Sequence, residues 1–376
     1  MKMHGNRQLI QVVPRMTPVR CGVSDGALLL AGELKAAFGI KTAIAVVNSS
    51  ERCDVQLPIE YCIPARLLET CLSLNRGEPG NLLVHLSGYG YSADGAPVLL
   101  AEALERVKAD GRFRIAVFFH ELYAGGMPWT SAFWYARRQK RAYRRIFEAC
   151  DLPITNARVF ADWLNRQAVP RTTSPVQCVP VFSQVGEAEE RVPFAVRDPL
   201  MAVFGLGGTR QRVYRELDKL GDTLRQLGVV GIVDIGPECG APGTVDGIAV
   251  KRMGVLTAAE IDRHLTRTAF GFLAYSPNCL AKSGVFAAYS AHGVIPVIAQ
   301  HFREEMDGLR DGVHVLSPPT VRNIAPHRLE ESSIAAWRWY SGHRLRNHAA
   351  IYDGWLATTG LDTTDGVGES VVQENE

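Results

Sequence analysis

Residues 200–212, LMAVFGLGGTRQR, decide the fold class. The five apolar residues predict a buried strand, the glycines predict a tight turn, and the polar residues that follow begin a segment of helical period. Short apolar runs and helical segments alternate in this way along the chain, which is typical of strand–helix repeats around a parallel sheet. The expected strands are Leu9–Val13, Thr42–Val47, Leu82–Leu86, Arg114–Phe119, Leu200–Phe204, Val229–Ile235, Phe270–Tyr275 and Val294–Ile298.

The chain divides near its middle. Its 376 residues exceed the roughly 100–200 of a typical domain, so two domains are expected. The stretch GEAEERVPFAVRDP, residues 186–199, is charged, contains prolines and lacks apolar periodicity, which indicates a linker. Each half repeats the strand–helix pattern. We therefore expect an α/β protein with two Rossmann-like, doubly wound domains, 1–188 and 199–335, facing a central cleft. The polar, acidic residues 357–376 indicate a flexible tail.

Composition excludes several classes of protein. The chain is 47% hydrophobic and 21% charged, as in water-soluble globular proteins. The net charge of +2 gives no long-range field for nucleic acid, so no such partner is expected. Eight cysteines without a C-x-x-C pair, and ten histidines without ligand spacing, indicate neither a disulfide scaffold nor a metal site. With no signal peptide and no run of roughly 18 apolar residues, we expect a cytoplasmic protein.

Six loops follow the predicted strands and contain glycine or polar residues. In parallel sheets, ligands bind beyond the carboxyl ends of the strands. These loops therefore indicate a cleft ligand that carries phosphate groups. They are MTPVRCGVSDG (16–26), SGYGYSADG (87–95), HELYAGGMPW (120–129), GLGGTRQR (205–212), GPECG (236–240) and SPNCLAKSG (276–284).

The loop GLGGTRQR is the best phosphate candidate. Its glycines let the backbone approach an anion, the next helix presents free N–H groups, and Arg210 adds a cation. It matches neither a Walker A loop nor the dinucleotide fingerprint, so a glycine-rich turn with a solvated arginine is an equal alternative.

Lys282, Ser283 and Gly284 precede a second helix. A lysine is unfavourable at the positive end of a helix unless an anion is bound there, although it can also point to solvent.

His120 and Glu121 end an apolar strand, so the imidazole should reach the same rim and could position or exchange protons. A histidine hydrogen-bonded within the loop is the alternative.

Residues 137–145, RRQKRAYRR, contain six basic positions next to aromatic residues 133–135 and Phe147. Such a stretch can rest on an anionic membrane surface, or it can be a solvated helix face.

Taken in order, these features resemble a GT-B-fold glycosyltransferase of the retaining, nucleotide-sugar-dependent type called group 1 or glycosyltransferase family 4. The similar segments are CGVSDGALLLAGEL (21–34), FFHELYA (118–124), CDLPITNARVFADWL (150–164), VPVFSQVGE (179–187), AVFGLGGTR (202–210), MGVLTAAEIDRHL (253–265), FGFLAYSP (270–277) and AAYSAHGVIPVI (287–298). AAWRWYSGHRLRNHAA (335–350) is similar to the family's C-terminal helix, which would cross back to the first domain over residues 336–356.

One departure is clear. The family carries two glutamates separated by seven residues, but CLAKSGVFAAYSAHG (279–293) contains no acidic residue, and Lys282 lies near the place of the first. A carboxylated or otherwise anionic donor sugar would fit that change. The family's phosphate-binding lysine is also altered, with Arg212 or Arg215 as substitutes.

The resemblance implies transfer of a sugar from a nucleotide-diphosphate sugar to a glycan or lipid-linked acceptor, with retention of configuration, in cell-surface polysaccharide synthesis. No metal and no cofactor are expected, and peripheral membrane contact through residues 137–145 is a separate hypothesis that rests on the basic stretch itself. The catalytic residues would be His120, Arg210 and Lys282. The donor-binding residues would be Gly207, Gly208, Thr209, Gly236, Tyr275, Ser276, Ser283 and Gly284. The acceptor-binding residues would be Gly22, Val23, Ser24, Tyr89, Tyr91 and Glu121.

Two other functions are weighed against this one. The missing glutamates favour a catalytically inactive GT-B-fold partner or glycan-binding protein of a polysaccharide-assembly complex. A dinucleotide oxidoreductase is weaker, because both its glycine fingerprint and its acidic ribose residue are missing.

Overall fold

The computed structural model describes residues 7–16, 22–49, 55–125, 127, 129–167, 175–322 and 324–358. Several expectations fall on other positions. Residues 17–21 of the first cleft loop, residues 126 and 128 of the third, Cys21, Cys53, and the predicted tail from residue 359 onward lie outside the described residues.

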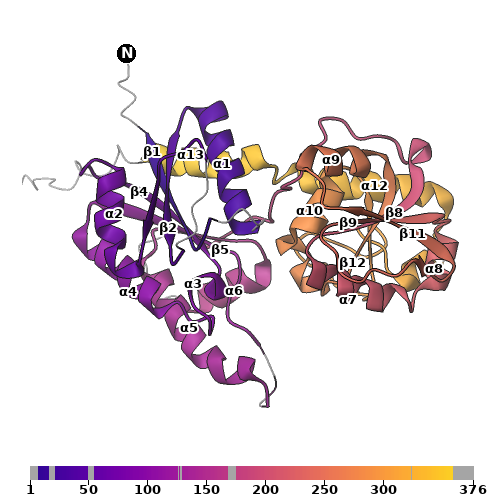
Figure 1. Ribbon diagram of the computed structural model, residues 1–376, viewed down its shortest axis with the longest axis horizontal. Helices are drawn as coiled ribbons and strands as arrows, with labels where there is room; N and C mark the ends of the chain where they lie inside the picture. Colours follow the sequence, from indigo (N-terminus) through magenta and orange to yellow (C-terminus); the bar gives the residue numbers. More distant parts are fainter. Residues whose placement is uncertain are drawn as a thin grey trace, which may run out of the picture.

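The first domain is built on a seven-stranded sheet with the order β3-β2-β1-β4-β5-β6-β7, and every neighbouring pair is parallel. Its central strands are apolar and buried because helices cover both faces (Figure 1). The strands are β1 (Gln8–Val13), β2 (Lys41–Val47), β3 (Ile59–Cys62), β4 (Gly80–Leu86), β5 (Phe113–Phe119), β6 (Leu152–Thr155) and β7 (Gln177–Cys178). The helices are α1 (Gly22–Phe38), η1 (Pro64–Arg66), α2 (Leu67–Leu74), α3 (Gly88–Tyr91), α4 (Val98–Asp110), α5 (Ser131–Ala149) and α6 (Arg158–Arg166).

The second domain has a six-stranded sheet with the order β10-β11-β9-β8-β12-β13, parallel except for the β10–β11 pair. The strands are β8 (Asp198–Phe204), β9 (Gly231–Ile235), β10 (Thr244–Val245), β11 (Ile248–Gly254), β12 (Thr268–Leu273) and β13 (Ile295–Ile298). The helices are η2 (Phe194–Val196), α7 (Gly207–Leu217), α8 (Gly221–Gln226), α9 (Ala258–Arg267), η3 (Pro277–Lys282), α10 (Gly284–Ala291), α11 (Pro318–Val321) and α12 (Pro326–Ser341).

The predicted fold class is confirmed. All eight predicted strands are present, and both sheets have the doubly wound order in which the chain reverses direction beside the first strand of the domain. In the first domain this switch lies between β1 and β4, and in the second between β8 and β12. The sequence missed β3, β6, β7 and β10, which have four residues or fewer, and β11, whose residues are mostly exposed or half-buried.

The C-terminal segment differs from the single helix expected over 336–356. α12 ends at Ser341, and a separate helix, α13 (Leu345–Ala357), begins after a break at Gly342. α13 packs on α1 of the first domain, where Tyr352 and Leu356 join the apolar cluster around Leu30 (Figure 1). The crossing back to the first domain is therefore made by residues 342–344.

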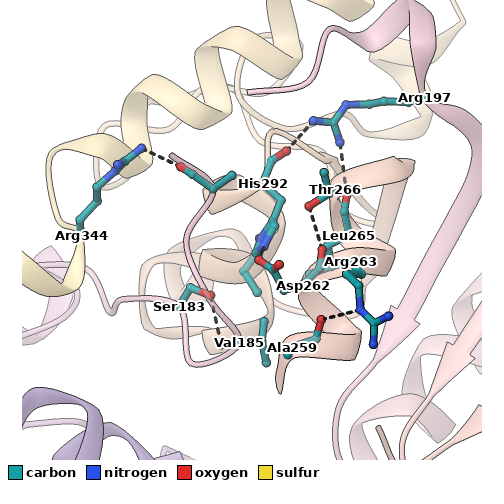
Figure 2. Close-up of polar contacts among 12 residues, drawn as sticks. Ser183, Val185, Arg197, Ala259, Asp262, Arg263, Leu265, Thr266, His292 and Arg344 are labelled. Carbon is teal, nitrogen blue, oxygen red and sulfur yellow. Dashed lines mark hydrogen bonds and ion pairs between the residues drawn. The ribbon is translucent and has the colours of Figure 1, made fainter. Parts of the chain in front are cut away.

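The stretch expected as a linker, residues 186–199, is instead fixed to the second domain. Arg197 is 7% exposed, and its guanidinium donates hydrogen bonds to the carbonyls of Leu265, Thr268 and His292 at the ends of α9 and α10 (Figure 2). Carbonyls in the last turn of a helix lack partners within the helix, and an arginine satisfies them well. Desolvation by burial lowers the pKa of Arg197 to about 10.

The two segments that connect the domains, one near residue 187 and the other at residues 342–344, meet at Glu187. Its carboxylate accepts hydrogen bonds from the Tyr340 hydroxyl and from the Leu345 amide, the latter at 2.8 Å. Beside it, Arg344 donates to the Ala188 carbonyl at 3.2 Å (Figure 2). The two connections between the domains are thus tied to each other.

Candidate functional site

Two adjoining cavities lie beyond the carboxyl ends of the strands. The first, here called the central pocket, has a volume of about 450 Å³ and is lined from both domains, with His120 and Asn156 on one side and Lys282 on the other. The second, here called the glycine pocket, has a volume of about 330 Å³ and is formed mainly by the turns at Gly205 and Gly236. The two pockets share Gly22, Gln184, Leu206, Tyr275 and Gly284, so they form one continuous site.

A third hollow of about 640 Å³ lies at the chain crossings, lined by Cys178, Asp307, Trp339 and His343 among others. It is larger and more open than the other two. No predicted site residue lines it, so the chemistry is placed in the central and glycine pockets.

The glycine pocket depends on two backbone turns that come very close. Gly205 and Gly236 follow β8 and β9 with φ angles of 127° and 143°, a region that side chains disfavour. A Cβ on Gly236 would lie 2.4 Å from the Gly205 carbonyl oxygen. The turns can pack in this way only because both residues are glycine.

The same pocket lies at the first turns of α7 and α10, which begin at Gly207 and Gly284. The Ser283 hydroxyl caps α10 by accepting a hydrogen bond from the Phe286 amide at 3.2 Å. Helix first turns carry unpaired N–H groups and a partial positive charge, which suits an anionic ligand. Of the residues that line this pocket, Asp25 alone is acidic.

Arg210 does not face this pocket as the sequence analysis expects. Its side chain is 1% exposed and forms an ion pair with Asp234 on β9. It also donates hydrogen bonds to the carbonyls of Gly205, at 3.1 Å, and Pro237. The guanidinium is thus used to join the two glycine turns. Contrary to the expectation, Arg210 does not line the pocket. It holds together the two turns that form the pocket.

Lys282 lies at the end of η3, immediately before the cap of α10, and lines the central pocket. Its ammonium is 3.5 Å from a carboxylate oxygen of Glu121 and 5.7 Å from the centre of the Phe160 ring. Glu121 and Phe160 belong to the first domain, so Lys282 bridges the two domains.

His120 is central to a buried polar chain. Its Nε2 lies 3.2 Å from Nδ1 of His85, and Nε2 of His85 lies 2.6 Å from Oε1 of Gln11. Burial lowers the pKa of His120 well below its ordinary value, with further contributions from His85 and His348. Burial also lowers the pKa of His85, to about 3. Both imidazoles are therefore neutral at physiological pH.

The predicted donor residues are only partly brought together. Thr209, Gly236 and Ser283 line the glycine pocket, while Tyr275 and Gly284 line both pockets. Three others line neither pocket. They are Gly207, Gly208 and Ser276.

Of the six predicted acceptor-binding residues, three line the central pocket and three do not. Gly22, Val23 and Glu121 line the central pocket. The other three line neither pocket and have structural partners instead. Ser24 is buried and donates to the Arg15 carbonyl, and Tyr89 accepts from the Gln139 amide at 3.3 Å.

Tyr91 is the third of these and belongs to the core. It is 7% exposed, and its hydroxyl lies 3.2 Å from the carbonyl oxygens of both Val12 and His85. It therefore fixes the backbone of the strand that carries His85. The expectation that Ser24, Tyr89 and Tyr91 contact the acceptor is not supported by where these side chains lie.

Several lining residues were missed by the sequence analysis. They include His85, Asn156, Gln184, Leu206, His348 and Tyr352. His348 and Tyr352 come from α13, so the C-terminal helix that packs on the first domain also lines the site. A polar residue within an apolar strand, such as His85 in NLLVHL, is the one local signal that could have pointed to this group.

The basic stretch 137–145 lies on α5, its residues line neither pocket, and half of its charges are compensated. Three of its six basic residues are ion-paired: Arg138 with Asp94, Arg144 with Glu148, and Arg145 with Glu105. The Lys140 ammonium lies 4.2 Å from the centre of the Tyr123 ring. Exposed aromatic residues instead gather before and within the first turns of α5, where Trp129 is 78% and Trp134 72% exposed.

A comparison with protein-family models finds no match, and a comparison with curated proteins finds none either. Solved structures match over nearly the whole chain. An alpha-glucosyltransferase in complex with UDP and a 13-mer DNA containing a HMU base has a TM-score of 0.61 and 10% identity, covering 94% of this chain and 100% of that one.

Two further structures are similar. S. aureus MnaA in complex with UDP has a TM-score of 0.54 and 9% identity, covering 96% of this chain and 100% of that one. The alpha,alpha-trehalose 6-phosphate synthase from Burkholderia multivorans has a TM-score of 0.59 and 11% identity, covering 94% and 99%. These structures have the two-domain GT-B architecture. The protein therefore has the GT-B fold, and the resemblance seen in the sequence is confirmed at the level of the fold.

Proposed function

We propose that the protein transfers a sugar from a nucleotide-diphosphate sugar to a glycan or lipid-linked acceptor. The proposal rests on one observation: the glycine pocket, which suits an anion, is continuous with the central pocket, which suits hydroxyl groups. The glycine pocket offers two helix first turns and close backbone approach, which suit a diphosphate. The central pocket offers His120, Asn156 and Glu121, which suit hydroxyl groups. Similar structures that hold UDP support this reading.

Lys282 would stabilise the leaving diphosphate. It precedes the cap of α10 and lines the central pocket, while Ser283 and Gly284 line the glycine pocket, so its ammonium lies near the boundary between the two. Negative charge grows on the diphosphate as the bond to the sugar breaks, and a fixed cation and helix amides lower the energy of that state. No protein nucleophile is required in this reaction.

The two domains would exclude water from the reacting sugar. Residues of both domains line the central pocket, and the Lys282–Glu121 pair spans it at 3.5 Å. Closure around the donor would prevent its hydrolysis. Retention of configuration and a role in cell-surface polysaccharide synthesis follow from the family resemblance and are part of the same proposal.

The first experiment measures nucleotide binding by thermal unfolding. The full-length protein is mixed with UDP, GDP, ADP and TDP, with and without a sugar. A ligand present at 100 times its Kd should raise the free energy of unfolding by about 2.7 kcal/mol. If none of the nucleotides stabilises the protein, the proposal fails.

A second experiment separates the enzyme from its main alternative. An inactive GT-B-fold partner or glycan-binding protein would show no turnover with any donor and acceptor pair. For an active donor, the product's anomeric configuration is read by NMR coupling constants. The same anomer in donor and product supports retention, and the opposite anomer excludes it.

We further propose that the protein contacts anionic membranes through the start of α5. We place this contact at Met127 and residues 129–141 rather than at 137–145, because Arg144 and Arg145 are paired with acidic neighbours. Met127, Trp129 and Trp134 are exposed there, and Arg137 and Arg141 have no ion-pair partner among the described residues. Exposed tryptophans beside free arginines suit the boundary between lipid headgroups and acyl chains. Within the described part of the chain, no helix is long and apolar enough to cross a membrane.

Liposome co-sedimentation tests this surface. The variant Trp129→Ala/Trp134→Ala should lose binding to anionic vesicles, whereas Val230→Ala, an equally exposed apolar site on the second domain, should keep it. Equal binding to neutral and anionic vesicles would contradict the proposal. Preferential binding of duplex DNA over vesicles would also contradict it, and would point to a nucleic-acid acceptor.

A further inference from the structure

A chain of hydrogen bonds runs from the core of the first domain to the central pocket. It begins at Gln11 on β1, which is fully buried. The side-chain amide of Gln11 donates to the Ala27 carbonyl at 2.9 Å. Its NH₂ group is therefore on that side, and its oxygen faces Nε2 of His85 at 2.6 Å. Gln11 can only accept a hydrogen bond from His85.

This contact fixes where His85 carries its proton. His85 is 4% exposed, and burial lowers its pKa to about 3, so it has one ring proton at neutral pH. That proton is on Nε2, because the facing Gln11 oxygen is an acceptor. Nδ1 of His85 is then an acceptor as well, and it lies 3.2 Å from Nε2 of His120.

The same reasoning continues to His120. Its Nε2 must donate to His85, and because the ring is neutral its Nδ1 then carries a lone pair. No described residue donates a hydrogen bond to this lone pair, and His120 lines the central pocket. The two rings are nearly coplanar, with 25° between their planes and their centres 5.5 Å apart, which suits an N–H···N hydrogen bond within the ring planes.

A second unused acceptor lies on the neighbouring strand end. Asn156 is 1% exposed, and its NH₂ group donates to the His120 carbonyl at 3.0 Å. Its Oδ1 is buried and has no hydrogen-bond partner among the described residues, although Asn156 lines the central pocket. Leaving such an oxygen unpaired costs about 1–3 kcal/mol, so it is expected to be matched by a ligand.

We propose that Gln11 and His85 are positioning residues that hold His120 in its Nε2–H form, so that Nδ1 of His120 and Oδ1 of Asn156 accept hydrogen bonds from hydroxyls of the sugar in the central pocket. The nature of the ligand rests on the proposed function, whereas the tautomer does not. Two neighbouring acceptors favour hydroxyl donors and disfavour a carboxylate at this position. An anionic group on the donor would have to lie elsewhere, nearer Lys282.

The tautomer is tested without any ligand. The full-length protein is labelled with ¹⁵N-histidine, and long-range ¹H–¹⁵N correlations are recorded at neutral pH. The His120 signals are assigned by their loss in His120→Gln. We expect a protonated Nε2 and an unprotonated Nδ1 on His120. A proton on Nδ1, or a doubly protonated ring, would overturn the proposal.

Two substitutions of His85 test the relay itself. His85→Leu removes the acceptor that faces His120, whereas His85→Asn keeps an oxygen near the place of Nδ1. We expect His85→Leu to lose the single-tautomer signature and to lower kcat about tenfold, and His85→Asn to restore both. A single Nε2–H form in His85→Leu would overturn the relay. Unchanged signals from His343, which lies outside the relay, show that each variant is folded.

Fluorinated sugars test the hydroxyl contact. A fluorine in place of a hydroxyl accepts but does not donate, so each monofluoro analogue of the active donor probes one hydroxyl. We expect one analogue to lose kcat/KM at least about tenfold in the wild type and much less in Asn156→Ala. Equal losses in both proteins for every analogue would overturn the contact. If no donor is turned over, the proposed function fails, while the NMR result still decides the tautomer.

Discussion

Arg210 and Asp234 form a buried ion pair beneath the glycine pocket. Their side chains are 1% and 4% exposed, and the Tyr214 hydroxyl donates to the second carboxylate oxygen of Asp234 at 2.6 Å. Arg210 also donates to the carbonyls of Gly205 and Pro237, so one guanidinium links the turns after β8 and β9. The shape of the pocket thus depends on an ion pair that does not line it.

Replacing Arg210 should therefore affect stability as well as activity. Arg210→Ala leaves Asp234 buried without its cation, and we expect a loss of about 3–5 kcal/mol in the free energy of unfolding, measured by urea denaturation. Turnover should fall at least about tenfold because the two turns lose their link. A fully stable Arg210→Ala protein with reduced turnover would instead favour direct contact with the diphosphate.

Lys282 should matter for catalysis and little for stability. Its side chain is 21% exposed, and its ion pair with Glu121 is long at 3.5 Å. We expect Lys282→Ala to lower kcat at least about tenfold, the equivalent of roughly 1.4 kcal/mol of transition-state stabilisation. Lys219→Ala, at an exposed lysine that follows the C-terminus of α7, is the matched control and should leave kcat unchanged. Steady-state rates that are equal for Lys282→Ala and the wild type would remove Lys282 from the mechanism.

Gly236 should tolerate no side chain. Gly236→Ala would place a Cβ 2.4 Å from the Gly205 carbonyl oxygen at a φ of 143°. We expect the substitution to cost about 1–3 kcal/mol in stability and to weaken UDP binding, measured together by thermal unfolding with and without UDP. Gly243→Ala, where no heavy atom lies within 4 Å of the new Cβ, should change neither. Normal UDP binding by Gly236→Ala would show that the diphosphate does not use this turn.

Stability should fall steeply in mild acid. Burial lowers the pKa of His85 and His343 to about 3 and that of His348 to about 4. In the unfolded chain these groups titrate near 6.5, so below that pH the unfolded state binds protons that the folded state does not. Their contribution is therefore complete above about pH 6.5 and is lost as the pH falls toward 4.

Each such histidine lowers the free energy of unfolding by up to about 1.4 kcal/mol per pH unit in this window. Urea denaturation at a series of pH values between 7 and 5 measures the slope. His343→Gln should reduce it. A stability that is flat across this range would mean that these histidines are solvated in the folded state.

The sequence predicted the fold because parallel strands are marked locally. Buried on both faces, they are continuous apolar runs, and several are followed by a glycine-containing turn and a helix, as β8 is by Gly205 and α7. β6 was not predicted because it has four residues and contains Pro153. β11 was not predicted because its residues are exposed or half-buried, so it lacks an apolar run. Such strands owe their pairing to neighbours that are distant in the chain.

The site was harder to predict because its decisive contacts are long-range. His120 could be found from its place at a strand end, but its partner His85 is 35 residues away, and the next partner, Gln11, is 74 residues from His85. Arg210 was misjudged for the same reason, since its partner Asp234 lies 24 residues further along. A charged residue inside the apolar strand GIVDI was a usable sign, because a buried carboxylate needs a cation.

Glu187 joins the two connections between the domains, and Lys282 forms an ion pair between the domains at the central pocket. Because both connections between the domains are hydrogen-bonded to one carboxylate, we expect any relative motion of the domains to be smallest near Glu187. Across the central pocket, the Lys282–Glu121 pair fastens the two halves. If the proposed donor binds, its diphosphate would compete with Glu121 for Lys282, so a contact between the two domains would be exchanged for a contact with the ligand.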